Sequence, residues 1–252
     1  MSRYYYDLHL HSCLSPCADN DMTPNNIAGM AALAGLQIAA LTDHNSCKNC
    51  PAFFAACKRY GVVPVAGMEL TTAEDIHLIC LFEDLEAAME FDRALSVHRI
   101  LIRNRTDIFG EQLILDENDG IIGTEEYLLS NATDLSIENA ADFARSYGAV
   151  VYPAHIDREG NGILAVLGIL PEKPLFSAAE FHDAEQIAAI QAKHPGIAGK
   201  NIVICSDAHY MEDIPDAKNA VELEDEPYSA TLIRRNLLSW LRTEQEESRI
   251  DR

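Results

Sequence analysis

Short apolar runs alternate with longer stretches of mixed polarity over residues 1–95. Residues 38–42 form a continuous apolar run, of the kind that is buried on both faces of a parallel sheet. Thr23-Pro24 has the form of a helix start, with Thr23 as the N-cap and Pro24 in the first turn. The pattern predicts strands over 4–10, 38–42, 62–66 and 76–82 and helices over 24–35, 52–60 and 85–95. This alternation indicates a parallel α/β architecture.

The alternation breaks between His98 and Thr133. Residues 111–123 have the pattern of two short strands around a polar turn that contains Asp119-Gly120. We interpret residues 98–133 as an insertion, or flap, within a single domain that covers residues 1–252. The pattern then resumes and predicts helices over 136–148, 184–193 and 230–241 and strands over 149–153, 175–181 and 201–205.

Composition narrows the possible partners. The chain has 252 residues, a hydrophobic content of 48% and a formal net charge of -21. Phosphate neutralisation supplies most of the energy for binding long nucleic acid, so this charge argues against such a partner, although a local positive pocket is compatible with it. The sequence shows no apolar run long enough to span a membrane and no cleavable leader pattern. We therefore expect a cytoplasmic protein with a small phosphorylated substrate, without membrane or long nucleic acid partners, and of undetermined oligomeric state.

An odd number of cysteines indicates reduced thiols rather than a disulfide framework. They are Cys13, Cys17, Cys47, Cys50, Cys57, Cys80 and Cys205. The first four lie in two loops that would share one edge of the sheet, where four thiolates could bind zinc or an iron–sulfur cluster. Their spacing is not that of a zinc ribbon, and the alternative is a set of reduced, partly buried thiols.

Histidines and carboxylates stand mostly at the ends of the predicted strands. His9 and His11 project to the same side of the first strand, where two imidazoles can share a metal ion. An isolated pair of this kind is more often two ordinary histidines, but other apolar runs end in similar groups. These are Asp43-His44, Glu69, His77, His155 and Asp207-Ala208-His209. Mixed histidines and carboxylates suit zinc, manganese or iron, and two close ions can activate a shared hydroxide.

The order of these motifs resembles the PHP family, named for polymerases and histidinol phosphatases. The matching motifs are the HxH of His9 and His11, Thr42-Asp43-His44, the lone Glu69, the spaced His77 and His155, and the final DxH of Asp207 and His209. The resemblance covers nearly the whole chain. It implies a distorted (β/α)7 barrel of PHP type, here with a hairpin-containing insertion, and a metal centre of two or three divalent ions at the C-terminal rim.

The resemblance also implies which residues hold each ion. His9, His11, Glu69 and Asp207 would hold the first, Glu69, His77 and His155 the second, and His44 and His209 the third, together with a residue of the first loop. The family often has Ser-Asp-Gly soon after the HxH, whereas residues 15–24 form a longer loop. Counting back from Thr23-Pro24 places Asp19 in the ligand position, with Asp21 as its competitor. The third sub-site would make the centre trinuclear.

The resemblance implies a hydrolase that acts on phosphate ester bonds, as a phosphatase or phosphodiesterase. We expect hydrolysis of a small phosphorylated metabolite or nucleotide by metal-activated hydroxide. The alternatives are a short-oligonucleotide 5'-3' exonuclease, a non-catalytic metal-binding module, and amide hydrolysis.

Two further residues are catalytic candidates. Arg158 follows His155 closely and could bind a phosphate bidentately, with Arg103 and Arg105 as rivals. Asp43 is the second candidate, and we expect Asp7 and Asp43 to orient ligand imidazoles. His98, His182 and His194 match no motif.

Overall fold

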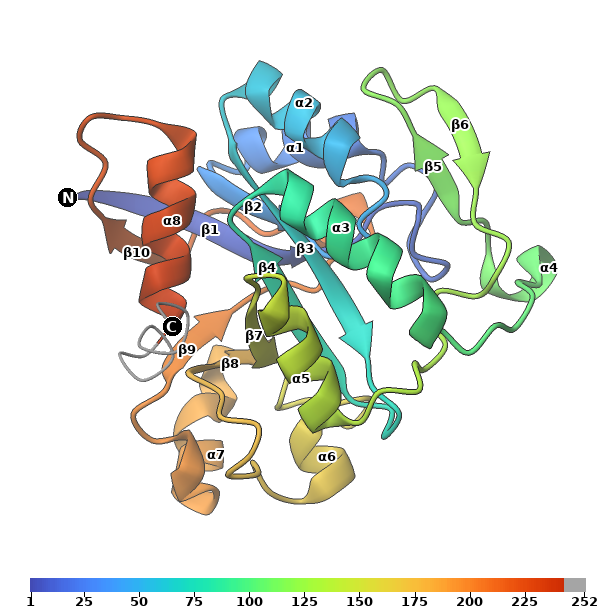
Figure 1. The fold of residues 1–252 in the computed structure, drawn as a ribbon. Helices are drawn as coiled ribbons and strands as arrows, with labels where there is room; N and C mark the ends of the chain where they lie inside the picture. Colours follow the sequence, from blue (N-terminus) through green and yellow to red (C-terminus); the bar gives the residue numbers. More distant parts are fainter. Residues whose placement is uncertain (243–252) are drawn as a thin grey trace.

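The main sheet of the protein curls into half a barrel, with helices packed on its outer face (Figure 1). The computed structural model describes residues 1–242. The strands are β1 (Ser2–Leu10), β2 (Ile38–Leu41), β3 (Val63–Thr71), β4 (His77–Phe82), β5 (Leu113–Leu115), β6 (Ile121–Thr124), β7 (Val150–Pro153), β8 (Ala178–Phe181), β9 (Asn201–Ile204) and β10 (Ala220–Leu223). The helices are α1 (Pro24–Leu33), α2 (Cys50–Tyr60), α3 (Leu85–Leu95), α4 (Thr106–Phe109), α5 (Ile137–Ser146), α6 (Ile163–Leu167), α7 (Ile187–Lys193) and α8 (Ala230–Leu241). Within residues 1–242, no helix has the length and apolar character needed to cross a membrane.

The strand order in the main sheet is β10-β1-β2-β3-β4-β7, and β8 and β9 form a separate parallel pair. Backbone hydrogen bonds close the ring at the end where the histidines lie. The Ile156 N–H donates to the Glu180 carbonyl at 2.9 Å, and the His11 N–H donates to the Ala208 carbonyl at 3.0 Å. The β8–β9 pair is thereby tied to the ends of both β7 and β1, and the predicted distorted barrel of PHP type is confirmed.

The expectation of an all-parallel sheet is wrong for β4 and β10. Strand β4 runs antiparallel to both β3 and β7, and β10 runs antiparallel to β1. A parallel connection needs a crossover of a dozen or more residues, whereas only a tight turn around Asp75 joins β3 to β4. The sequence contains no helical segment between these two strands, which was the available signal.

Two apolar layers lie on the two faces of the sheet. On β3, Val63 and Val65 pack inside the barrel with residues of α8, while Ala66 and Met68 pack outward against the layer that contains α1, α2, α3 and α5. This alternation places Glu69 on the inner row of β3, two residues beyond Gly67. The Glu69 carboxylate therefore lies inside the barrel, just beyond the last layer of apolar side chains.

The segment 98–133 contains α4 and the antiparallel hairpin of β5 and β6. It packs against the loops that follow β1 and β2. The Leu113 N–H donates to the Cys13 carbonyl at 2.8 Å, and the Asn45 amide donates to the Leu129 carbonyl at 2.7 Å. That the segment acts as a flap over the functional end stays a prediction.

Candidate metal centre

An irregularity in β1 directs two histidines into the barrel. Tyr6 and Leu8 point to the interior, but Leu10 packs on the outer face, so the alternation changes along the strand. The pairing of β1 with β2 shifts register between Asp7 and Leu10. Bulges of this kind re-aim side chains near functional sites. Here the bulge turns His9 and His11 inward, where both are fully buried.

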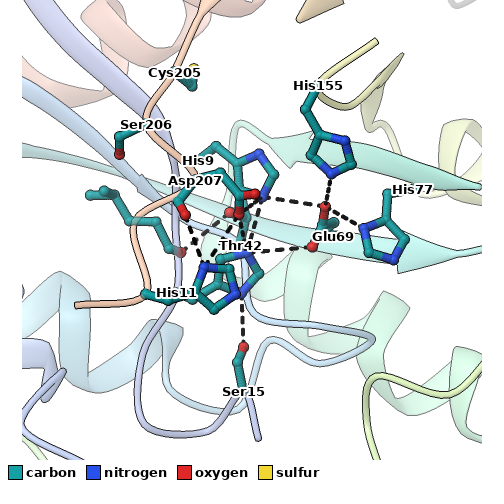
Figure 2. Close-up of polar contacts among 12 residues, drawn as sticks. His9, His11, Ser15, Thr42, Glu69, His77, His155, Cys205, Ser206 and Asp207 are labelled. Carbon is teal, nitrogen blue, oxygen red and sulfur yellow. Dashed lines mark hydrogen bonds and ion pairs between the residues drawn. The ribbon is translucent and has the colours of Figure 1, made fainter. Parts of the chain in front are cut away.

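Glu69 lies at the centre of the histidine cluster (Figure 2). Its side chain is 1% exposed, and imidazoles approach both carboxylate oxygens. The nearest nitrogen–oxygen distances are 2.7 Å for His77, 2.9 Å for His44, 3.0 Å for His155 and 3.4 Å for both His9 and His11. A carboxylate in this position is suited to bridge two cations.

Two ligand candidates lie in strained backbone after their strands. Asp207 has a φ of 54° and His155 a φ of 25°, in the left-handed region that side-chain-bearing residues seldom adopt. The strain coincides with placement in the cluster. The Asp207 Oδ1 lies 3.2 Å from the His9 Nε2 and 3.1 Å from the His11 Nε2, and the His155 Nε2 faces Glu69.

Hydrogen bonds fix the tautomers of the two barrel histidines. The His9 Nδ1 lies 2.8 Å from the Glu180 Oε1, and the His11 Nδ1 lies 2.9 Å from the Ser15 Oγ. The Ser15 hydroxyl donates to the Asp43 Oδ1 at 2.7 Å, so it accepts from His11. Both imidazoles are thus protonated on Nδ1 and present an electron pair on Nε2.

The resulting arrangement fits a cation better than it fits a proton network. In the neutral forms that bind metal, the Nε2 atoms of His9 and His11 carry no proton. They are 3.0 Å apart, and carboxylate oxygens of Glu69 and Asp207 lie beside them. The Asp207 Oδ1 and the Glu69 Oε2 are buried without a well-formed hydrogen bond. Electron pairs that converge in this way repel one another unless a positive ion lies between them, which is the environment that a divalent metal requires.

Three groups of potential ligands lie close enough to hold an ion each. They are His9, His11, Glu69 and Asp207; His44, Glu69 and His77; and His11, His44 and His209. His155 approaches the same oxygen of Glu69 as His77 does. The structure thus brings together every expected ligand except Asp19, and their role as ligands stays a proposal.

The structure places Asp19 outside these groups. Its side chain is exposed, and its Oδ1 accepts a hydrogen bond of 2.8 Å from the Asp21 N–H within the same loop. Asp21 is exposed as well. Counting back from Thr23-Pro24 assumed the family's loop length, but the extra residues bulge outward. Cys17 lies closer to the histidines, with its Sγ 3.2 Å from the His44 Nε2.

Electrostatics within the cluster favour a negative Glu69 and raise the pKa of His9, His11 and His44, whereas burial lowers the pKa of His77. Burial alone would raise the pKa of Glu69, but His77, His9 and His44 hold it well below its usual value. Burial opposes charge on His9 as well, yet Glu180, Asp207 and Glu69 raise its pKa well above the ordinary value. Without metal, the cluster therefore retains protons, which an incoming cation must displace.

The thiol of Cys17 is acidic in the same field. Although the residue is exposed, partial burial of its sulfur would raise the pKa of Cys17, but hydrogen bonds and charge from His209 and His44 outweigh that effect and lower the pKa to about 5. The sulfur therefore carries negative charge at neutral pH.

Two positioning residues were not predicted from the sequence. Glu180, at the end of β8, accepts from the His9 imidazole and from the His155 N–H, the latter at 3.2 Å. Its place at the end of a predicted strand was the available signal. Ser15 links His11 to Asp43, and serines in loops carry no such signal.

The expected role of Asp7 in orienting an imidazole is wrong. Its carboxylate accepts from the backbone N–H groups of His9 and Ser206, at 3.2 and 3.3 Å. Burial raises the pKa of Asp7 to about 6. Asp43 accepts from the Ser12 and Ser15 hydroxyls, so it reaches His11 through Ser15 and lies one residue away from the ligand cluster.

The four cysteines of the two loops do not converge. The Cys47 Sγ donates to the Gly67 carbonyl at 3.2 Å, Cys13 packs with Leu113 and Leu115, and Cys17 lies beside His44. All seven cysteines are free, and none belongs to the groups of potential metal ligands among residues 1–242. The structure therefore shows separate reduced thiols rather than a four-thiolate site.

Arg158 lies in the wall between two cavities. A cavity of about 250 Å³ over the cluster is lined by residues that include Glu69, His155, Arg158 and Asp207. A neighbouring pocket of about 680 Å³ shares Arg158 and Asp207 and adds His182 and Lys218. One terminal nitrogen of Arg158 forms an ion pair with the Asp207 Oδ2, and the other lies 3.2 Å from the His182 imidazole.

The rival arginines are engaged elsewhere, within the insertion. Arg103 pairs with Glu126 at 2.8 Å, and Arg105 pairs with Asp107 at 2.7 Å. His98 pairs with Asp134. Arg158 is therefore the arginine that lines the cavity over the cluster.

The PHP domain family model matches residues 7–156, and no curated protein matches the chain. Endonuclease Q from Pyrococcus furiosus shares the fold with a TM-score of 0.64 and 18% identity, over 94% of this chain and 56% of that one. The chain thus spans a little over half the length of endonuclease Q. A Bifidobacterium adolescentis protein proposed to be a metal-dependent phosphoesterase gives a TM-score of 0.51 and 16% identity, over 92% and 95% of the two chains. An amidohydrolase from Chromobacterium violaceum, solved with bound sulfate, gives a TM-score of 0.52 and 18% identity, over 87% and 92%.

The comparisons correct one expectation. A second endonuclease Q structure, in complex with a 27-mer duplex that carries an abasic lesion, shares the fold with a TM-score of 0.58 and 18% identity, over 93% of this chain and 56% of that one. Restriction to a small substrate, without long nucleic acid, was therefore wrong. The expectation was based on the net charge of the whole surface, whereas a substrate is bound by the local electrostatic field at the end of the barrel that carries the site. The family match covers more than half of the chain, and together with the barrel and its histidine–carboxylate cluster it shows that the protein belongs to the PHP domain family, whose fold and neighbours support a metal-dependent hydrolase.

Proposed function

We propose that the protein is a metal-dependent phosphoesterase. The observation that carries this proposal is the position of Arg158, a cation in the wall between the cavity over the ligand cluster and the larger pocket beside it. A phosphoryl group in the smaller cavity would meet the guanidinium and the cluster together, while the remainder of the substrate extends into the larger pocket. Zinc, manganese and iron suit the donor set, and two or three ions fit its groups.

The ions would be held by residues of the three groups described above, which overlap at Glu69, His11 and His44. Because His11 has one free nitrogen, it would hold one ion only. Divalent ions there would supply the charge that activates water and stabilises an oxyanion. The chain's own residues complete the site. Glu180 and Ser15 hold His9 and His11 in the tautomers that leave Nε2 free. Arg158 keeps further N–H donors beyond its two contacts, and these can bind phosphoryl oxygens as negative charge develops on them.

The substrate in this proposal is a phosphate ester, and nucleic acid phosphodiesters are included. His182 and Lys218 line the larger pocket with Arg158 and supply positive or polar groups for a second phosphate or a sugar. An endonuclease or a short-oligonucleotide 5'-3' exonuclease is the second candidate, favoured by the likeness to endonuclease Q. The hairpin segment 98–133, which rests on the loops after β1 and β2, would limit how long a strand reaches the rim.

Amide hydrolysis is the rival chemistry, and the chain resembles one amidohydrolase in fold. The bridging group here is the carboxylate of Glu69, and no lysine lines the cavity over the cluster within the described part of the chain. A site without a carbamylated lysine lacks the bridge that some metal-dependent amidohydrolases use. The arginine and the carboxylate bridge together support phosphate ester hydrolysis.

The proposal is tested by presenting zinc-, manganese- and iron-loaded protein with matched substrates. The panel contains a phosphomonoester, a phosphodiester, a 5'-phosphorylated oligonucleotide, a duplex with an abasic site and an N-acylated amino acid. We expect release of phosphate, or cleavage of a phosphodiester, that depends on metal and is lost in Glu69→Gln. Turnover of the amide alone would overturn the proposal, and absence of all turnover in the metal-loaded protein would favour a non-catalytic module.

A further inference from the structure

We infer that Cys17 is the first-loop ligand of the third metal sub-site, as a thiolate beside the imidazoles of His44 and His209. This inference rests on the proposed metal centre and adds a sulfur donor to it. The sub-site otherwise contains His11, His44 and His209, whose nitrogens lie close enough to share an ion. Because the one free nitrogen of His11 would hold the first ion, His44 and His209 leave positions of a tetrahedral site to be filled by other donors.

The sulfur lies next to these imidazoles, although it is not within reach of all three of their nitrogens. The Cys17 Sγ lies 3.2 Å from the His44 Nε2 and also interacts with His209. The ring of His209 stacks on that of His11, with centroids 4.1 Å apart, and His11, His44 and His209 each have a nitrogen within reach of the other two. The His44 Nδ1 is buried and lacks a well-formed hydrogen bond, and it lies 2.9 Å from the Glu69 Oε2. His44 thus presents one nitrogen toward Glu69 and the other toward Cys17.

The loop that carries Cys17 is held at both ends. Gly110 of the insertion has a φ of 84°, and a Cβ there would lie 2.7 Å from the carbonyl oxygen of Pro16, so only glycine permits this approach. On the other side, the Asp19 N–H donates to the His209 carbonyl at 3.0 Å. These contacts leave the Asp19 carboxylate pointing to solvent and hold Cys17 against the imidazoles.

A sulfur ligand changes the metal that the sub-site selects. Thiolates favour zinc and other borderline or soft ions, whereas carboxylate oxygens also suit manganese and magnesium. The third sub-site is therefore expected to discriminate against manganese more strongly than the carboxylate-rich first sub-site does. Cys17 is the one exposed cysteine, while the other six are buried, so its chemistry can be followed separately.

The test uses cobalt as a spectroscopic substitute for zinc. We load the full-length protein with Co²⁺ and record the visible d–d bands, which report all bound cobalt, and the near-ultraviolet band of thiolate-to-cobalt charge transfer. The parent protein should show both. Cys17→Ser should lose the near-ultraviolet band, keep visible bands from the remaining sites and bind about one ion fewer by elemental analysis. Asp19→Asn is the matched control and should behave as the parent does.

Alkylation provides a second measurement that requires no variant to fold. In the metal-free protein, iodoacetamide should modify Cys17 ahead of the six buried cysteines, and added Zn²⁺ should protect it, as peptide mass spectrometry can show. Cobalt binding without the near-ultraviolet band, or alkylation of Cys17 that zinc does not slow, would overturn the assignment of Cys17 alone. Loss of an ion in Asp19→Asn but not in Cys17→Ser would return the ligand role to Asp19. Failure to bind any cobalt would overturn the metal centre itself.

Discussion

Replacement of Glu180 by alanine should weaken the metal centre although Glu180 is not a proposed ligand. The side chain is 1% exposed and accepts two hydrogen bonds, from the His9 Nδ1–H at 2.8 Å and from the His155 N–H at 3.2 Å. Both donors belong to residues at the cluster. In Glu180→Ala they lose their acceptor, and the His9 proton is free to move to Nε2, which faces Glu69 and Asp207.

The magnitude follows from these two contacts. A buried donor left without a partner costs about 1–3 kcal/mol, so the metal-free fold should lose roughly 2–6 kcal/mol if neither donor finds water. Loss of a residue that orients a metal-bound histidine typically lowers metal affinity by about 10- to 100-fold. We expect the upper end of this range for Glu180→Ala, which is about 2.8 kcal/mol. Glu180→Gln keeps an amide oxygen as acceptor, but a neutral acceptor is weaker, so a loss of about tenfold is expected.

The assay is competition for Zn²⁺ with a chromogenic chelator, paired with chemical denaturation of the metal-free protein. Glu185→Gln removes an exposed carboxylate close by in the chain and serves as the control, since it should change neither measurement. If Glu180→Ala remains folded and binds zinc within about twofold of the parent protein, the tautomer argument for His9 is refuted.

The remaining predictions concern the bridge, the phosphate, the protons and the barrel wall. Glu69→Gln should abolish activity and lower the number of bound ions, because its carboxylate faces five imidazoles; elemental analysis that finds the full number of ions would contradict the bridging role. Arg158→Ala should retain its metals but lose about 100-fold in kcat/KM, which is ~2.7 kcal/mol, and Arg158→Lys should recover only part of this; kinetics within about twofold of the parent would show that another group holds the phosphate. Metal affinity should fall as pH falls, and the loss should begin above pH ~6.5, the ordinary pKa of histidine, because the pKa of His9 is raised in the metal-free cluster and protonated His9 cannot bind metal. Chelator competition that shows the same metal affinity at several pH values would contradict this. Gly67→Ala should lower the free energy of unfolding by about 1–3 kcal/mol, because a methyl group would lie 2.7 Å from the Thr42 side chain, and an unchanged denaturation midpoint would show that the wall can relax.

Local signals in the sequence predicted local structure well. Thr23 caps α1 by accepting from the Asn26 N–H at 3.2 Å, and Ser136 caps α5 by accepting from the Asn139 N–H at 3.3 Å. The helix predicted over 85–95 is observed over Leu85–Leu95. Strand direction depends instead on the segment that connects two strands. The prediction of a parallel β4 did not take into account that no helix lies between β3 and β4. Strand β10 depends on pairing with β1 more than 200 positions earlier, a contact for which a short apolar run gives no signal.

The candidate site shows a similar division. Histidines at strand ends were recognisable by their order, and the structure brings them around Glu69, while their role as ligands stays a prediction. Backbone detail decided the rest. The bulge in β1 directs His9 into the barrel. Ala154 packs inside the barrel, so strict alternation would direct His155 outward, but the left-handed φ of His155 turns its side chain inward. Cys17 rather than Asp19 lies beside His44, a difference that counting from one end of a loop of unusual length could not predict.

The barrel closes between β1 and the segment after β9, and this closure also determines at which stage of synthesis the metal centre can form. His9 and His11 are synthesised almost 200 residues before Asp207 and His209, and the His11 N–H bonds to the Ala208 carbonyl only once both are present. At about 5–20 residues per second, the ribosome exposes the early histidines many seconds before their partners. The nascent chain can offer only fragments of the ligand set during that interval. Metal uptake is therefore expected to be a late step in maturation, so that the ions available to the completed chain, rather than those met during synthesis, determine which metals it carries.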